Sequence, residues 1–222
     1  MRFLLLLSLV AMEVAAAAAA APPAAFERYG NVYYRSADGS VRQLTRGGNY
    51  GEPSLSPNGR TVAFIHEDSK SSAESDNGQT SLWIGDGVGG RVRKLLSPQP
   101  NDQPERNLAS FGNPVFSLDG GYVYIGADAW ATSSAIHQVN LATGRERFVV
   151  GGWLHGVLRN GPYRGFLVVG QHRYHPAPKF GSYNPVFILR PDGKEILRIP
   201  GTEIDDGRDR LSGWLKMKGW RL

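Results

Sequence analysis

Apolar and polar residues alternate in short segments along most of the chain, and turns that contain Gly separate these segments. Residues 53–59 end in the turn Ser-Pro-Asn-Gly and lead into the β-branched and aromatic residues 60–65. The same pattern returns in residues 114–120, which end in Ser-Leu-Asp-Gly and lead into residues 121–125. An alternation with a period of two, next to a Gly turn, predicts a hairpin of half-buried strands. The return of one hairpin pattern along the chain indicates a repeat architecture.

A second kind of hairpin alternates with the first. Each of these hairpins has two short apolar strands joined by a turn with Gly, which supplies the positive φ that a tight turn needs. Four hairpins of this kind are predicted, over residues 32–44, 82–95, 136–149 and 186–199. We interpret them as the outer strand pairs of successive blades, and the hairpins of the first kind as the inner pairs.

The hairpins together predict an all-β fold, a β-propeller of about four blades. Three inner pairs, over residues 54–65, 115–125 and 156–169, combine with the four outer pairs into three full blades and an N-terminal half blade. A ring has to close, because open ends expose strand edges and an apolar face. Residues 214–218 alternate apolar residues with Lys, so we expect them to form the closing strand, with a short basic amphipathic helix as the alternative. A further alternative is a partial propeller that dimerises, and the sequence leaves the oligomeric state open.

The first 21 residues have the layout of a secretory signal peptide. Arg2 precedes an apolar run over residues 3–12 and an Ala tract that ends at Ala21, where small residues suit a signal peptidase. A membrane span needs about 20 apolar residues, and Glu13 interrupts this run too early. We therefore expect cleavage, one domain over residues 22–222 without a membrane span, and a periplasmic or secreted location. A retained tethering helix is the alternative.

Composition narrows the chemistry that is available. The sequence contains no Cys, which excludes disulfides, thiolate zinc sites and Cys nucleophiles. The formal net charge of +5 suits anionic neighbours such as an outer-membrane surface or polyanionic glycans, although dispersed Lys and Arg also serve solubility alone. No basic run is long enough to indicate a nucleic-acid partner.

One repeat carries a family resemblance. Residues 53–64, Pro-Ser-Leu-Ser-Pro-Asn-Gly-Arg-Thr-Val-Ala-Phe, closely resemble the propeller repeat of the TolB family, and residues 114–125 resemble a weaker copy. The resemblance extends over residues 32–199 as a series of blades, and it implies a periplasmic β-propeller that engages other proteins or envelope components. TolB itself has an α/β domain ahead of a six-bladed ring, and this sequence matches neither that domain nor the full number of blades. We therefore expect a TolB-like propeller and carry over no partner-binding residues.

The long links between hairpins are expected to lie on one face of the propeller, opposite the tight turns. Long loops held by a rigid scaffold commonly carry the binding residues. Aromatic and polar side chains on these links are the candidate binding residues: Asp128, Trp130, Trp153, His155, His172, Arg173 and Tyr174. Trp and Tyr near Arg are typical anchors of protein or sugar contacts, and the alternative is that Trp153 and Tyr174 only cover the ends of blades. No metal site is expected, because His172 and His175 are three residues apart outside a helix and do not converge.

Two functions of different classes fit these residues. The chain contains no nucleophile elbow, no His-Glu-x-x-His motif and no phosphate-binding loop. The first function is a non-catalytic scaffold, without a cofactor, that binds a protein or glycan of the cell envelope through the long-link face. The second is a small glycan- or peptide-processing enzyme that uses carboxylates at the channel mouth, such as Asp128 with Glu52 or Glu105.

Overall fold

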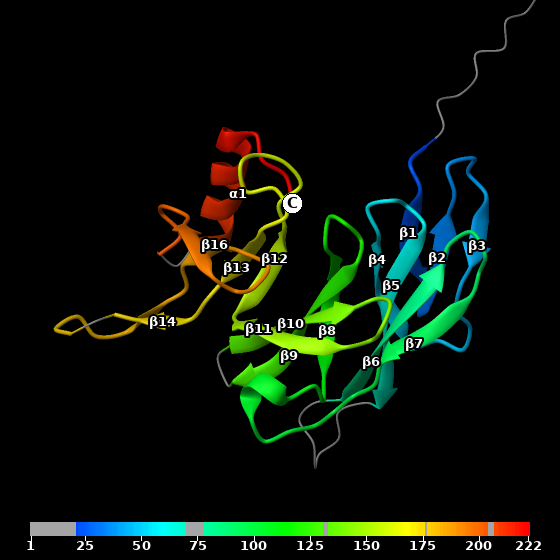
Figure 1. Ribbon diagram of the computed structural model, residues 1–222, viewed down its shortest axis with the longest axis horizontal. Helices are drawn as coiled ribbons and strands as arrows, with labels where there is room; N and C mark the ends of the chain where they lie inside the picture. Colours follow the sequence, from blue (N-terminus) through cyan, green and yellow to red (C-terminus); the bar gives the residue numbers. More distant parts are fainter. Residues whose placement is uncertain (1–20, 70–77, 131–132, 176, 204–206) are drawn as a thin grey trace, which may run out of the picture.

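The computed structural model describes residues 21–69, 78–130, 133–175, 177–203 and 207–222, without the side chains of residues 207–209. Within these residues the chain forms the strands β1 to β17, the helix α1 and the short 3-10 helix η1 (Pro104–Arg106) (Figure 1). Of the signal sequence predicted over residues 1–21, all but Ala21 lies outside the described residues. No helix in the described part of the chain has the length and apolar character needed to cross a membrane.

The strands form antiparallel sheets in which neighbours along the chain are usually neighbours in space. The first sheet has three strands, β1 (Ala24–Arg28), β2 (Asn31–Arg35) and β3 (Val41–Gln43). The second sheet has four, β4 (Tyr50–Leu55), β5 (Thr61–Ser69), β6 (Gln79–Asp86) and β7 (Val92–Leu96). The third sheet has four, β8 (Phe111–Phe116), β9 (Tyr122–Trp130), β10 (Ser133–Asn140) and β11 (Glu146–Gly151). The fourth sheet has β12 (Trp153–Val157), β13 (Leu167–Gly170), β16 (Val186–Leu189) and β17 (Glu195–Arg198), and the small hairpin β14 (Arg173–Tyr174) and β15 (Ser182–Tyr183) projects beside it.

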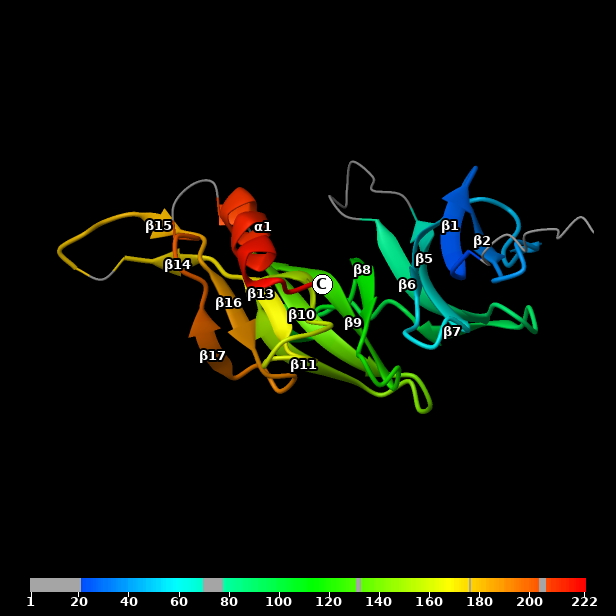
Figure 2. The same cartoon turned by 90° about the horizontal axis from the view of Figure 1, so that it is seen from above.

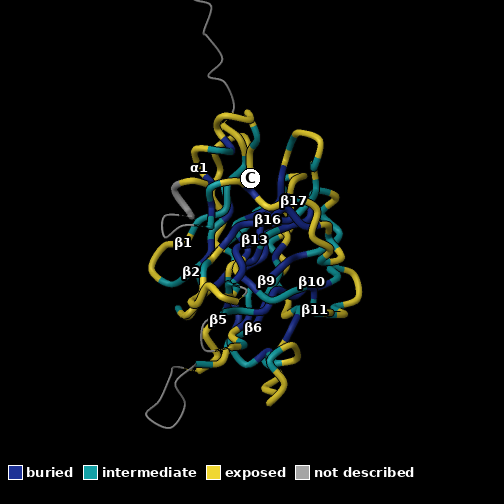
Figure 3. Tube along the Cα trace, turned by 90° about the vertical axis from the view of Figure 1, so that its left-hand side faces the viewer, coloured by how far each residue is buried: buried dark blue, intermediate teal, exposed yellow. Residues whose placement is uncertain are grey.

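The inner and outer hairpins predicted from the sequence are all present, and the all-β, propeller-type fold is confirmed. Successive sheets follow one another through the molecule and pack face to face (Figure 2). Val32 and Tyr34 of β2 pack against Val62 and Phe64 of β5, which joins the first two sheets through a shared apolar core. Most of the buried positions lie in the strands, whereas the turns and links are more exposed (Figure 3).

Side-chain hydrogen bonds build the recurring Ser-x-Asn/Asp-Gly turn. In the turn between β4 and β5, the Ser56 hydroxyl donates to Asn58 Oδ1 at 2.7 Å, and the Thr61 amide donates to Ser56 Oγ at 2.9 Å. In the turn between β8 and β9, Ser117 donates to Asp119 in the same way at 2.5 Å. These bonds satisfy backbone groups that the hairpin leaves unpaired, and they lower the pKa of Asp119 because the Ser117 hydroxyl stabilises its charged form. The sequence repeat is therefore a folding signal rather than a site.

The strand predicted for residues 214–218 is wrong, and so is the closure of the ring by that strand. The segment belongs to α1 (Gly207–Lys218), which is the helical alternative. Leu211 and Leu215, four residues apart and so on one face of the helix, pack against Val186 and Ile188 of the fourth sheet. The alternation over five residues was too short to separate a strand from a helix whose apolar face covers the last blade.

The first sheet gains a strand that the sequence analysis did not identify. β1 pairs with β2 through a two-residue turn at Tyr29 and Gly30, whose φ values are 52° and 66°. Positive φ at both positions is the geometry of the tight hairpin turns that match the twist of antiparallel strands. The dipeptide Tyr-Gly is a weaker signal than Asn-Gly or Asp-Gly, which explains why the strand was missed.

Replacement of Leu215 with Ala tests the contact of α1 with the fourth sheet. Leu215 is 8% exposed within an apolar cluster, so Leu215→Ala is expected to lower the free energy of unfolding by about 2–4 kcal/mol. Met217, on the same helix, is 69% exposed, and Met217→Ala is the matched control with little expected change. Urea unfolding followed by circular dichroism measures both variants, and equal stability of the two would contradict the packing of α1 on the sheet.

Candidate functional site

A central cavity of about 520 Å³ lies where the innermost strands of three sheets meet. Strands β4, β8 and β12 supply most of its lining. Leu55, Val115 and Phe116 give it apolar walls, while Glu52 and Arg159 add charged groups of opposite sign. A cavity of this size, apolar with a few placed polar groups, is the usual form of a binding site for a small molecule or a short segment.

A bulge at the same place in β4 and in β8 shapes this cavity. The pairing of β4 with β5 shifts register between Gly51 and Ser54, and the pairing of β8 with β9 shifts between Gly112 and Val115. The residue after each Gly has a positive φ, 51° at Glu52 and 52° at Asn113. Bulges re-aim side chains and are common next to binding and active sites.

These bulges link the three innermost strands by polar contacts. The Asn113 amide donates to Glu52 Oε2, and Asn113 Nδ2 donates to the Leu154 carbonyl at 3.1 Å. The first contact depends on a Gly, because a Cβ at Gly112 would lie 2.9 Å from Glu52 Oε2. Sequence reasoning missed this arrangement, although the signal was present as Gly-Glu-Pro at residues 51–53 and Gly-Asn-Pro at residues 112–114.

The segment after α1 forms one wall of the cavity. The Arg159 amide donates to the Arg221 carbonyl at 2.8 Å, and the Arg221 amide donates to Asn160 Oδ1, also at 2.8 Å. Asn160 Nδ2 donates to the Gly219 carbonyl at 2.9 Å, so this side chain holds the segment at two points. As a result Leu222 lies against Gly156 of β12 and lines the cavity.

Of the seven predicted binding residues, His155 lines the central cavity. Trp153, two residues earlier on β12, is 37% exposed at the long-link end of the same strand and lies near Gly170. Trp130 ends β9, is 38% exposed and covers Gly151. Asp128 lies on the same strand as Trp130 with its side chain exposed, outside the lining of the cavity.

The other three predicted residues lie at the small hairpin β14–β15, which projects from the fourth sheet (Figure 1). Arg173 forms an ion pair with Glu195 of β17, and its guanidinium lies 5.3 Å from the centre of the Phe187 ring. His172 and Tyr174 are in edge-to-face contact, with ring centres 5.1 Å apart, and Tyr174 is 74% exposed. The structure therefore places these three residues away from the central cavity and does not bring them together with His155.

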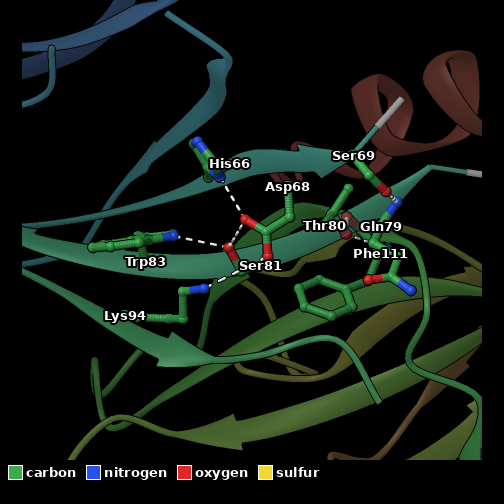
Figure 4. Close-up of polar contacts among 9 residues, drawn as sticks. All are labelled: His66, Asp68, Ser69, Gln79, Thr80, Ser81, Trp83, Lys94 and Phe111. Carbon is green, nitrogen blue, oxygen red and sulfur yellow. Dashed lines mark hydrogen bonds and ion pairs between the residues drawn. The ribbon is translucent and has the colours of Figure 1, made fainter. Parts of the chain in front are cut away.

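A second polar cluster lies on the face of the second sheet that is turned toward the first (Figure 4). His66 Nδ1 is 2.5 Å from Asp68 Oδ1, and the Ser81 hydroxyl donates to the same oxygen at 2.8 Å. Lys94 Nζ is 3.5 Å from Asp68 Oδ2, and its ammonium group lies 5.4 Å from the centre of the Trp83 ring. Asp68 thus connects β5, β6 and β7 through one carboxylate.

This cluster is suited to stabilising the sheet rather than to nucleophilic catalysis. Burial by itself would raise the pKa of Asp68, but the hydrogen bonds from His66 and Ser81 and the charge of Lys94 outweigh burial, so the pKa lies below its ordinary value of 3.8. The Ser81 side chain is fully buried and donates to Asp68 instead of to His66, so His66 is not placed as a base for that hydroxyl. In the part of the chain that the structure describes, no group of three or more His, Asp or Glu is arranged to hold a metal ion.

Comparison with known proteins identifies similar folds without a close relative. No protein-family model matches the sequence, and no curated protein sequence matches it significantly. Dipeptidyl peptidase 4 of Porphyromonas gingivalis aligns at 12% identity with a TM-score of 0.57, over 81% of this chain and 31% of that chain. The tricorn protease aligns at 16% identity with a TM-score of 0.55, over 80% of this chain and 16% of that chain. The chain thus spans less than a third of the length of either protein, and at these identities the likeness concerns the fold alone.

The low pKa of Asp68 leads to a prediction about acid stability. A carboxylate whose pKa is lowered by folding stabilises the native state above its unfolded pKa, and this contribution is lost as the pH falls through the folded pKa. At pH 7 we expect Asp68→Asn to lower the free energy of unfolding by about 1 kcal/mol, and we expect the difference from the wild type to shrink below about pH 4. Thermal unfolding at pH 7 and pH 3 measures the effect, with the exposed Asp102→Asn as control. A difference that is the same at both pH values would contradict the assignment.

Proposed function

We propose that the protein is a non-catalytic binding module of the cell envelope that holds a segment of a partner protein in its central cavity. The observation that carries this proposal is the convergence of three innermost strands on one cavity with apolar walls and a few polar groups. The signal layout of residues 1–21 supports action in the periplasm or outside the cell, and residues 22–222 are the proposed single binding domain.

The shape and chemistry of the cavity favour a protein segment as ligand. Leu55, Val115 and Phe116 offer apolar surface for a side chain of the partner, and burial of such a side chain is the main driving force of association. Glu52 and Arg159 present opposite charges within the same lining, which suits the dipolar groups of a peptide. His155 and the half-exposed Trp153 extend this surface along β12 toward the long-link face, where the sequence analysis had located the binding residues.

The enzyme alternative has less support from this cavity. Glycoside hydrolysis commonly uses two carboxylic acids on either side of the bond that is cleaved. Within the described lining, Glu52 is the acidic side chain, and it already accepts a hydrogen bond from the Asn113 amide. Asp128, which the enzyme hypothesis paired with Glu52, does not line the cavity.

Site-specific photo-crosslinking in the source cells tests the proposal. Arg159 is exposed at the cavity, so a benzoylphenylalanine in its place is expected to give a covalent adduct with one partner protein after irradiation. The same probe in place of Lys194, which is exposed in the turn between β16 and β17, is the matched control and is expected to give no such adduct. Equal labelling from both positions, or no adduct from position 159, would contradict a partner at the cavity.

Turnover assays separate the binding module from the enzyme. The proposal predicts no turnover of a panel of envelope glycans and peptides at any pH. Turnover that Glu52→Gln abolishes while the circular dichroism spectrum stays native would establish the enzyme and overturn the proposal.

A further inference from the structure

The first sheet is one strand shorter than the other three blades, and the missing position can be identified. Arg93 of β7 donates to the Leu141 carbonyl in the turn between β10 and β11 at 2.7 Å, and Arg147 of β11 makes the equivalent bond in the turn between β16 and β17 at 2.9 Å. Arg42 of β3 lies in the same way against Gly90, in the turn between β6 and β7. A Cβ added at Gly90 would be 3.1 Å from Nη1 of Arg42. β3 therefore occupies the outermost position of its sheet, as β7 and β11 do.

It follows that β1 has the second position of its sheet and that no strand of the described residues holds the innermost position. In the other sheets β4, β8 and β12 occupy that position. Among the described residues, the backbone hydrogen bonds of Ala24–Arg28 connect β1 to β2 and to no strand on its other side. With respect to the residues that the structure describes, the N–H and C=O groups on this edge are therefore open to pairing with an added extended segment.

A cavity of about 600 Å³ lies beside the end of β1, between β1 and the start of β4. Its lining contains Glu27, Glu52 and Glu67 and no Lys, Arg or His. In the described part of the chain none of these three carboxylates forms an ion pair, although the whole protein has a formal charge of +5. The negative charge at the open edge thus favours a segment with basic side chains.

We infer that a partner protein supplies an extended strand with basic side chains, which pairs with β1 and completes the first sheet. The strand adds its backbone to the free edge of β1, and its basic side chains lie in the cavity formed by Glu27, Glu52 and Glu67. The inference rests on the proposed function only in that the ligand is a protein. Segments of this chain fit the position poorly: the C-terminal segment packs on the fourth sheet as α1, and residues 3–12 carry no charge.

Peptides of defined sequence test the pairing directly. Fluorescein-labelled Lys-Val-Lys-Val-Lys-Val is expected to bind the purified protein in fluorescence anisotropy, whereas Glu-Val-Glu-Val-Glu-Val is expected not to bind. The Lys-Val peptide with a fully N-methylated backbone keeps the charges and loses the hydrogen bonds, so its affinity is expected to fall by about 10-fold or more. Glu27→Gln combined with Glu67→Gln is expected to weaken binding of the Lys-Val peptide by about 10-fold, while the control Asp102→Asn, at an exposed carboxylate outside the cavity, leaves it unchanged.

Hydrogen exchange locates the bound strand. The amides of Ala24–Arg28 are expected to become protected when the Lys-Val peptide is added. No binding by the Lys-Val peptide, equal binding by the N-methylated peptide, or protection confined to other strands would each overturn the inference. A dimer in light scattering without peptide would overturn it in favour of a second copy of this chain at the edge.

These outcomes are distinguishable from those of the proposed function. Pairing at β1 without an adduct from position 159 would overturn the central cavity as partner site and leave the strand addition intact. An adduct from position 159 without pairing at β1 would overturn the strand addition and leave the central cavity as the partner site.

Discussion

Each sheet of this fold has two apolar faces, and both have to be covered. For the sheets inside the series, the neighbouring sheets provide the cover, as Val32 and Tyr34 do for Val62 and Phe64. The two ends of the series have no such neighbouring sheet on one side.

At one end of the series, α1 covers the fourth sheet through Leu211 and Leu215. At the other end, the outer face of the first sheet carries the stacked rings of Phe26 and Tyr33, 5.5 Å apart, and the half-exposed Val41. The demand for cover is therefore met by α1 at the fourth sheet, whereas the outer face of the first sheet stays partly exposed.

The same stacking brings the innermost strands together and so creates the binding surface. Because β4, β8 and β12 occupy equivalent positions, their bulges meet around one axis, and a side chain from one strand can reach the backbone of the next. Glu52 and Asn113 make these contacts, and Gly112 leaves the room that the first of them requires. The first sheet interrupts the series because no described strand holds its innermost position. Its free edge and the carboxylates beside it are a direct consequence of the repeat being incomplete at that point.

The sequence predicted the parts of the fold that depend on local chemistry. Hairpins were found because Ser56, Asn58 and their counterparts form the turns by contacts within a few residues. The helix α1 and the strand β1 could not be assigned in this way, since tertiary packing decides the first and the second follows an unusual turn. The central cavity is formed by residues far apart in the chain, which local patterns do not bring together. Of the seven predicted site residues, His155 alone is among those that line it. His172, Arg173 and Tyr174 lie at the hairpin β14–β15, which projects away from the central cavity. The partner contacts expected at these three residues remain a prediction.

The most direct test of this account is hydrogen exchange of the free protein, compared strand by strand. β5, β9 and β13 have the second position in their sheets and are paired on both sides, whereas β1 has the same position with one side free. The account predicts that the amides of Ala24–Arg28 on the free edge exchange much faster than the amides of those three strands. Protection of β1 equal to that of β5, β9 and β13 would show that its edge is already occupied and would contradict the open first sheet.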